Sequence, residues 1–404
     1  MKRVLILVEN LPSPFDRRVW QEACALRDAG YTVSIICPTG RGCEKKFEAI
    51  DGIHIRRYDL PTEGEGALGY LVEYAAALFW TFILSLRVLL TRGFDVIHAC
   101  NPPDLFFLIG GFYKLFGRKF LFDHHDANPE LYVAKFGRRD RLYRLMLALE
   151  RWTFRLADVS IATNQSYERI AIGRGRMAPE RVFVVRSGPS LERMRIVPPV
   201  AALKRGRKFL VGYVGVMGRQ EGIDLLLQAV AHLVHRLGRR DIHFGLVGGG
   251  TSLEEMRALA AELEVDGHVT FTGRVPDAEM LAMLNTADVC VNPDVANEMN
   301  DKSTMNKIME YMALGKPIVQ FDLTEGRHSA QAASLYARRN DAADFAARVV
   351  ELLDDPERRR RMGEFGRRRV MDELEWRHEV PKLLAAYDAL WVPSPPRERI
   401  FFRP

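Results

Sequence analysis

The sequence contains few cysteines, and no two of them form a C-x-x-C pair. The five residues, Cys24, Cys37, Cys43, Cys100 and Cys290, are odd in number and scattered along the chain. This pattern argues against a disulfide framework and against a zinc site built on cysteines. We therefore expect a reducing compartment.

Long uncharged apolar runs are also missing. Val4 to Val8 is followed at once by Glu9, so it is too short for a signal-peptide core and predicts a first buried strand. The most apolar stretch, Leu68 to Leu90, has 13 uncharged residues between Glu73 and Arg87, whereas a membrane span needs about 20. A buried or interfacial helix is favoured, and its aromatic residues leave shallow insertion into a bilayer open.

The remaining composition is that of a globular protein. Of 404 residues, 48% are hydrophobic and 27% charged, which excludes a disordered, collagen-like or polytopic membrane chain. At this length we expect two domains.

Positive charge is concentrated in the first half, since residues 1–200 carry a net charge of +7 and residues 201–404 one of −1. The densest part, Lys135 to Arg155, interleaves arginines with Leu142, Leu145 and Trp152 at helical spacing, which predicts a basic amphipathic helix. It is either a solvated helix face or a surface that contacts a membrane or polyanion. No nucleic-acid-binding module accompanies the charge.

Short apolar runs alternate with helical patterns, which predicts βαβ units and a parallel sheet. This alternation is interrupted at residues 193–208, which form a basic linker with prolines, and it resumes with FLVGYVGV at 209–216. The fold class is therefore α/β, with two doubly wound Rossmann-like domains. Ligands of such sheets bind beyond the carboxyl ends of the strands, so we expect a site in a central cleft that the two domains face.

The most informative segment runs from Asn297 to Asp322. Ser303 is a suitable N-cap and Gly315 a suitable stop for a helix that buries Met305, Ile308, Met309, Met312 and Ala313. Glu310 lies on the opposite side. The amides of Thr304, Met305 and Asn306, with Lys302 and Lys307 nearby, would suit a diphosphate. The alternative is a capped surface helix with a Lys307–Glu310 pair.

Three other patterns carry less weight. The GLVGGG turn at 245–250 fails the G-x-G-x-x-G spacing at Leu253, although it suits a close approach to some nucleotide. His124, His125 and Asp126 follow a strand, but no further ligand at a fitting spacing completes a metal site. The chain also lacks an obvious D-x-D pair, so we expect no metal and no other cofactor.

The motifs together resemble family 4 glycosyltransferases of the GT-B fold. The likeness rests on E-Y-M-A-x-G-K-P-I-V from Glu310, on Gly273 to Pro293, on the glycine-rich stretches at 215–229 and 245–250, and on SPFDRRVWQEACAL, FDVIHACNPPD and FDHHDANPELY in the first half. It implies an acceptor domain at 1–192, a nucleotide-sugar-binding domain at 193–375, and a segment at 376–404 whose helix crosses back to the first domain.

The resemblance also assigns residues. Glu310 would bind the ribose hydroxyls of the nucleotide, and the amides at Thr304 to Asn306 the diphosphate. His125, with its neighbours His124 and Asp126, would help to position donor and acceptor. Arg274 and Val275 would lie beside the base. The glycine-rich donor loops would contribute Gly215, Gly218, Arg219, Gly248 and Gly249.

The sequence departs from the family at three of its charged positions. Where the family has a glutamate that holds the donor sugar, this chain has Lys302, with Asp301 adjacent. Where the family has an Arg and a Lys for the diphosphate, it has Val216 and Glu221. A leaving diphosphate needs stabilisation, and we expect Arg219 with Lys302 or Lys307 to supply it.

The resemblance implies a retaining hexosyl- or N-acetylhexosaminyl-type transferase that uses a nucleotide sugar and no metal. The basic first half suggests a lipid-linked or oligosaccharide acceptor in surface polysaccharide or glycan assembly. It also suggests a peripheral position on the anionic cytoplasmic face of a membrane. A nucleotide-sugar epimerase of similar fold and a non-catalytic partner subunit with a degenerate donor site are the alternatives.

Overall fold

The computed structural model describes residues 2–40, 42–60 and 66–393, and it describes no side chain for residues 66–68, 70 and 71. The chain folds into two compact units. The N-terminal unit comprises Met1–Tyr132, Arg138–Arg186 and the chain from Glu379, and the C-terminal unit comprises Val133–Gly137 and Ser187–His378. The end of the predicted C-terminal tail, beyond Pro393, lies outside the described residues.

The N-terminal unit is built on an eight-stranded sheet in the order β3-β4-β2-β1-β5-β6-β7-β8. Its strands are β1 (Arg3–Leu7), β2 (Thr32–Pro38), β3 (Phe47–Ile50), β4 (Ile53–Tyr58), β5 (Val96–Cys100), β6 (Lys119–His124), β7 (Val159–Ala162) and β8 (Val182–Val184). All neighbours pair in parallel except β3, which is antiparallel to β4. The predicted first strand is confirmed, with Val4 opposite Val33 and Val96.

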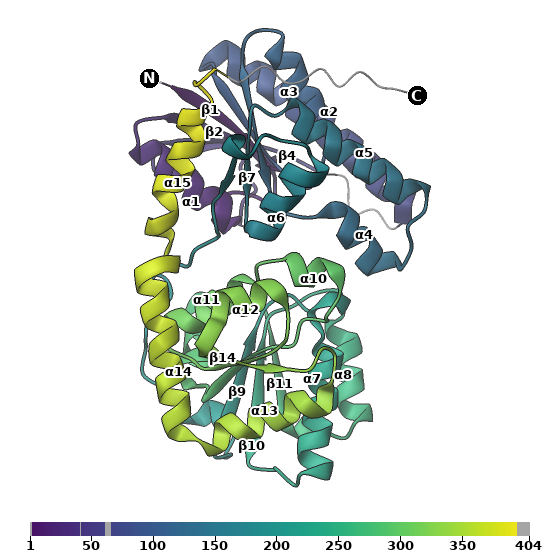
Figure 1. Ribbon diagram of the computed structural model, residues 1–404, viewed down its shortest axis with the longest axis vertical. Coiled ribbons are helices and arrows are strands. Elements are labelled where there is room, and N and C mark those ends of the chain that lie inside the picture. Colours follow the sequence, from purple (N-terminus) through teal and green to yellow (C-terminus); the bar gives the residue numbers. More distant parts are fainter. Residues whose placement is uncertain (1, 41, 61–65, 394–404) are drawn as a thin grey trace. The chain divides into compact units, whose positions relative to one another are not determined.

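Helices cover both faces of this sheet. They are α1 (Arg17–Asp28), α2 (Gly66–Thr91), α3 (Phe107–Lys114), α5 (Arg141–Leu156) and α6 (Gln165–Arg169), and α4 (Asn128–Phe136) and α15 (Trp376–Ala389) run across the unit boundary. Right-handed crossovers place α2, α3 and α5 on one face and α1 on the other. The buried side chains of α2, α3 and α5 accordingly share one apolar core with β1 and β5. Figure 1 shows these three helices in the N-terminal unit.

Helix α2 is longer than the uncharged run in the sequence. By length and composition alone, Val72–Thr91 could cross a membrane, and 28% of that window is buried. Ala77, Leu84 and Val88 join the apolar core, and Thr81 and Ser85 are buried on the same side. One side of the helix is therefore packed on protein.

The C-terminal unit holds a six-stranded parallel sheet in the order β11-β10-β9-β12-β13-β14. The strands are β9 (Phe209–Val214), β10 (Ile242–Val247), β11 (Val269–Gly273), β12 (Val289–Asn292), β13 (Ile318–Phe321) and β14 (Ser334–Ala337). The helices are α7 (Ile223–Ala231), α8 (Leu253–Glu262), α9 (Asp277–Thr286), α10 (Glu298–Lys302), α11 (Asn306–Ala313), α12 (Thr324–Ala330), α13 (Ala342–Asp354) and α14 (Pro356–Arg369). The strand order reverses between β9 and β12, where open α/β sheets bind ligands.

Candidate functional site

The loops that follow β9, β10 and β11 touch one another at the carboxyl edge of the C-terminal sheet. Four backbone hydrogen bonds join them, from Gly215 N to Val247 O (3.0 Å), from Met217 N to Gly249 O (3.1 Å), from Ser252 N to Met217 O (2.9 Å) and from Gly248 N to Gly273 O (3.0 Å). A Cβ atom on Gly248 would lie 1.8 Å from the Gly215 carbonyl oxygen, and its φ is +133°. Only glycine fits there, so the two predicted donor loops form one backbone-lined surface.

The first of these loops is closed by an acid. The Glu221 carboxylate accepts a hydrogen bond from the Gly218 amide at 3.0 Å, and burial raises the pKa of Glu221. Val216 and Arg219 are both exposed on the same loop. Of these side chains, Arg219 is therefore the one that could bring positive charge to a diphosphate.

Helix α11 begins at Asn306, and its N-cap is Met305, two residues after the predicted N-cap Ser303. The predicted N-cap is wrong, because the Ser303 hydroxyl donates to Met299 O at 2.8 Å and Ser303 ends α10. Thr304 and Met305 thus precede the helix. The first-turn amides, which have no acceptor within the helix, belong to Asn306 and Lys307.

The apolar stripe of α11 is confirmed. Ile308, Met309, Met312 and Ala313 are buried in one core, and Met305 packs against it partly buried. The predicted stop is confirmed as well, since α11 ends before Gly315, which has a φ of +68°.

Lys307 lies next to the first glycine-rich loop, since a Cβ on Gly215 would lie 3.2 Å from Lys307 Cε. Its ammonium is 2.8 Å from the buried Asp294 carboxylate and 5.2 Å from the centre of the Tyr213 ring. Although burial disfavours the charge, Asp294 keeps the pKa of Lys307 above its ordinary value. The alternative pair of Lys307 with Glu310 is not formed, because Glu310 pairs elsewhere.

Glu310 is held by an arginine that the sequence placed in a linker. The Arg193 guanidinium lies 2.8 Å from Glu310 Oε1, and it reaches Asp277 at 2.7 Å. The Glu310 side chain is 16% exposed, so it remains accessible to a hydroxyl group. Asp277 begins α9, directly after the predicted base-binding segment.

That segment follows β11. Arg274 is exposed, and its Cγ lies 3.4 Å from the position of a Cβ on Gly249. Val275 is partly buried against the core that also holds α11. The structure thus brings Arg274 to the glycine-rich loops.

Asp301 and Lys302 are both engaged within the C-terminal unit. Asp301 accepts hydrogen bonds from Thr324 N (3.0 Å) and Thr324 Oγ1 (2.9 Å) at the start of α12, and it pairs with Arg339. The Lys302 ammonium lies 2.9 Å from Glu298, one turn earlier in α10. A role for Asp301 in sugar binding would require it to leave these partners.

In the N-terminal unit, His124 and His125 differ in their surroundings. His124 is fully buried and stacks on Tyr167 with ring centres 4.8 Å apart, and burial lowers its pKa to about 3. His125 is 13% exposed, and its Nε2 lies 2.6 Å from Asp123 Oδ2. His125 is therefore the candidate for contact with a substrate, and His124 is a core residue.

A buried ion cluster supports His125. Arg18 Nη2 lies 2.9 Å from Asp123 Oδ1 and 3.0 Å from Glu22 Oε1, and Arg18 Nε lies 3.0 Å from His125 Nε2. Although burial opposes ionisation, Arg18 keeps the pKa of Asp123 well below its ordinary value. Burial raises the pKa of Glu22 well above its ordinary value, so the two carboxyl groups that face Arg18 differ in acidity.

The backbone after His124 is fixed by Asn101. Its Oδ1 accepts from the amides of His125 (2.7 Å) and Asp126 (3.2 Å), and its Nδ2 donates to Asp126 O (2.7 Å). Asp126 thus takes part in the same turn. The segment FDHHDANPELY thus forms a platform at the end of β6 whose backbone is hydrogen-bonded to Asn101.

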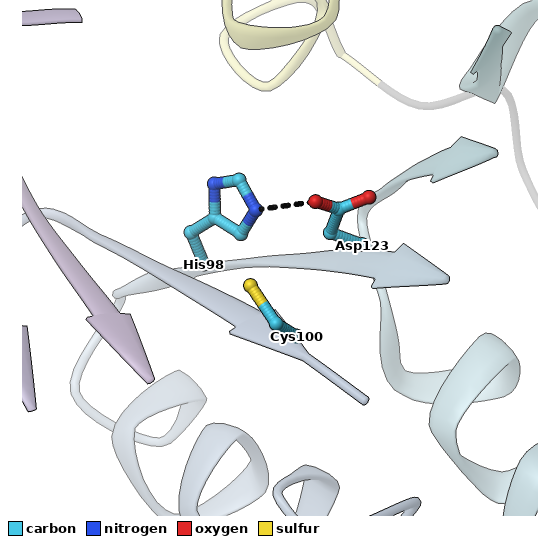
Figure 2. Close-up of side chains that lie close together, drawn as sticks. All are labelled: His98, Cys100 and Asp123. Atoms are coloured by element: carbon cyan, nitrogen blue, oxygen red, sulfur yellow. Dashed lines mark hydrogen bonds and ion pairs between the residues drawn. The ribbon is translucent and has the colours of Figure 1, made fainter. Parts of the chain in front are cut away.

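His98, Cys100 and Asp123 come close enough for a metal site, since one ligand atom of each lies within 4.8 Å of the others (Figure 2). Atoms of His98 and Asp123 already have protein partners. The two ring nitrogens of His98 contact Asp123 Oδ2 (3.3 Å) and the Tyr387 hydroxyl (2.8 Å). The other oxygen of Asp123 forms an ion pair with Arg18. Burial raises the pKa of the Cys100 thiol well above its ordinary value. These contacts fit a buried ion cluster better than a metal centre.

Several residues of the site were missed by the sequence reasoning. They are Arg18, Glu22, Asn101, Asp123, Arg193, Asp277 and Asp294. Only Arg18 and Glu22 leave a local signal, as an oppositely charged pair one helical turn apart. The others have partners at least 13 residues away along the chain, and Asp123 contacts the nearby His125 in addition to the distant Arg18.

Two protein-family models match the chain. Residues 16–188 match "Glycosyl transferase 4-like domain", and residues 208–355 match "Glycosyl transferases group 1".

Curated relatives are moderately similar. A 2-deoxystreptamine glucosyltransferase from Streptomyces kanamyceticus is 29% identical over 62% of this chain and 65% of its own length. A D-inositol 3-phosphate glycosyltransferase from Nocardia farcinica is 29% identical over 52% of this chain and 51% of its own. The chain thus matches between half and two thirds of the length of these relatives.

Solved structures agree over nearly the whole chain. Sucrose-phosphate synthase from Thermosynechococcus elongatus has a TM-score of 0.77 at 19% identity and covers 96% of this chain and 99% of its own. HepE from Anabaena, solved in complex with UDP-glucose, has a TM-score of 0.72 at 14% identity and covers 96% of this chain and 100% of its own. At such identities the likeness shows the fold.

Proposed function

The chain belongs to the family 4, or group 1, glycosyltransferases of the GT-B fold, and from this premise we propose that it transfers a sugar from a nucleotide-sugar donor to a saccharide acceptor. The observation that carries the proposal is the joined set of donor loops beside the first turn of α11. Backbone amides, close-approach glycines and the accessible Glu310 carboxylate lie there on one unit. Support also comes from HepE, which was solved with UDP-glucose.

The donor would lie across the loops after β9, β10 and β11. Glu310 would accept hydrogen bonds from the ribose, which would compete with Arg193 for the carboxylate. The first-turn amides of α11 and the exposed Arg219 would stabilise the diphosphate as it leaves. This arrangement needs no metal ion, and the proposal is metal-independent transfer.

The chemistry that fits is retention of the anomeric configuration. The acceptor hydroxyl would attack on the face from which the diphosphate departs, and a phosphate oxygen would take its proton. We propose a lipid-linked or oligosaccharide acceptor, used in surface polysaccharide or glycan assembly on the cytoplasmic face of a membrane. An inverted product anomer would contradict this mechanism.

A thermal-shift panel of UDP, GDP, dTDP and CMP sugars tests the donor site. A ligand at a hundred times its dissociation constant adds about 2.7 kcal/mol to the free energy of unfolding. We expect one nucleotide class to raise the melting temperature of the wild type and to lose that effect in Glu310→Ala. Glu264→Ala, at a position distant in sequence on the α8–β11 connection, is the matched control.

The departures at Val216, Glu221 and Lys302 favour a second candidate, a non-catalytic partner subunit. Such a protein would not respond to any nucleotide sugar in the panel, and it would copurify with an active homologue.

A further inference from the structure

Large apolar side chains are exposed on the three helices that cover one face of the N-terminal sheet. Their exposed fractions are, on α2, Val72 54%, Phe79 57% and Trp80 43%; on and just after α3, Phe112 37%, Leu115 82% and Phe116 62%; and on α5, Leu142 41%, Leu145 51% and Trp152 55%. Single exposed apolar residues are ordinary, but a group gathered on neighbouring helices marks an interaction surface.

Helix α2 shows the anomaly most clearly. Its inner side packs on the sheet through Ala77, Leu84 and Val88. Its outer side, where a helix on a water-soluble protein carries polar residues, presents Phe79 and Trp80 instead. Their rings contact each other edge to face, with centres 5.4 Å apart. The helix is therefore apolar on both sides while only one side is covered by protein.

The three helices form one continuous surface. The rings of Phe82 on α2 and Phe112 on α3 are 5.2 Å apart. On the other side of α3, a Cβ on Gly111 would lie 3.3 Å from the Leu156 side chain of α5. Figure 1 shows α2, α3 and α5 together in the N-terminal unit. We call their outer side the aromatic–basic face, made of the nine exposed residues given above and the arginines of α5.

The charge on this face is predominantly positive. The sequences of α2, α3 and α5 contain six basic residues and two acids. Of the two acids, Glu150 is buried and Glu73 is partly buried, whereas Arg141, Arg144, Arg151 and Arg155 are exposed. The Arg155 guanidinium also lies over the Trp152 ring, 5.6 Å from its centre.

We propose that the aromatic–basic face docks the protein on an anionic lipid bilayer. Aromatic and leucine side chains would enter the headgroup region while the arginines bind lipid phosphates. A second copy of the chain is a poorer occupant, because a symmetric contact would bring two sets of arginines together. The proposal deepens the proposed function, on which it rests for its purpose, since docking would bring the site to a lipid-linked acceptor.

The test is sedimentation of the full-length protein with vesicles of phosphatidylcholine alone and of phosphatidylcholine mixed with phosphatidylglycerol. We expect binding to the anionic vesicles, weakened by high salt. Arg144→Gln with Arg151→Gln should weaken partition about 30-fold, at the strength typical of basic residues near an anionic surface. The matched control, Arg361→Gln with Arg368→Gln on α14, removes the same charge from exposed arginines of the other unit and should leave binding unchanged.

A second variant tests the apolar contribution. Trp80→Ser with Phe116→Ser should lose vesicle binding while keeping the wild-type melting temperature, because both side chains are exposed. Leu237→Ser, an exposed apolar residue of the C-terminal unit, should bind as the wild type does. Equal binding by the face variants and their controls, or a change from dimer to monomer in place of vesicle binding, would overturn the proposal. The nucleotide-sugar thermal shift, measured without vesicles, should survive in every variant, so failure of docking and failure of the donor site are separate results.

Discussion

The carboxyl edges of the two sheets are organised by different means. In the N-terminal unit, buried charged side chains hold the platform, with Arg18 and Asp123 in contact with each other and with the partly exposed His125. In the C-terminal unit, backbone meets backbone through glycines such as Gly248, and the main buried ion pair near the loops is Lys307 with Asp294. The structure of the N-terminal (first) edge therefore depends on charge and protonation. That of the C-terminal (second) edge depends on glycines, whose lack of a side chain lets the loops touch.

The largest expected effect comes from removing the cation of the first edge. Arg18→Met leaves the Asp123 carboxylate buried without its guanidinium, and we expect it to lower the free energy of unfolding by about 3–5 kcal/mol. Urea unfolding measures this change. Arg361→Met, at an exposed position of α14, is the control and should shift stability by no more than about 0.5 kcal/mol. Equal effects of the two substitutions would break the comparison.

Protonation of a buried carboxyl group at the edge of the N-terminal sheet should change the free energy of unfolding. Glu9 directly follows the β1–Val8 segment, and burial, with Glu73 nearby, raises its pKa from 4.5 to about 7. The folded state thus binds this proton more tightly than the unfolded state. Its contribution to stability is fully present below pH 4.5 and is lost as pH rises toward 7, by about 3 kcal/mol at most.

Glu9→Gln should remove that slope from the free energy of unfolding measured between about pH 5 and about pH 8. Glu264→Gln, at an exposed turn of the C-terminal unit, should leave the slope in place. A wild-type profile retained by Glu9→Gln would show that other groups set the pH dependence.

At the edge of the C-terminal sheet, a larger side chain at a loop glycine should lower both stability and donor affinity. In Gly248→Ala the new methyl group would meet the Gly215 carbonyl oxygen, and the positive φ adds strain of about 1–3 kcal/mol. We expect this loss of stability together with at least a tenfold weaker donor affinity, read by calorimetry. Gly267→Ala is the control, since a Cβ there meets nothing within 4 Å. Normal donor binding by Gly248→Ala would mean that the loops can separate without cost.

The smallest effect concerns an ion pair at the surface of the second unit. Lys302 and Glu298 are one turn apart and substantially exposed, so Lys302→Gln should change stability by no more than about 0.5 kcal/mol. Arg257→Gln, which breaks the exposed pair with Glu254, should behave alike. A thermal melt of both variants checks this, and a loss above 2 kcal/mol in Lys302→Gln alone would show that charge also organises the second edge.

Local patterns predicted the fold well. The strand and helix alternation, the apolar stripe of α11 and the glycine turn at Gly315 all follow from short-range rules. Ser303 misled because a hydroxyl before a helix can also bond backward, as it does to Met299. Ser303 could either cap the start of α11 or end α10, and the local sequence is compatible with both.

The partners within the site could not be predicted in this way. Arg18 meets Asp123 across 105 residues, and Arg193 meets Glu310 across 117. Such pairs depend on the order of strands in a sheet, which spacing along the chain does not encode. Arg193 was therefore predicted only as part of a basic linker, whereas in the structure it binds Glu310 of α11.

The most direct test of glycosyl transfer is product analysis. The wild-type protein is incubated with the nucleotide sugar chosen by the thermal-shift panel and with a lipid extract as the source of acceptor. Release of nucleoside diphosphate should match the sugar found on the acceptor, and both should fall in Glu310→Ala. An epimerised nucleotide sugar formed without acceptor, or no turnover of any nucleotide sugar, would contradict the account.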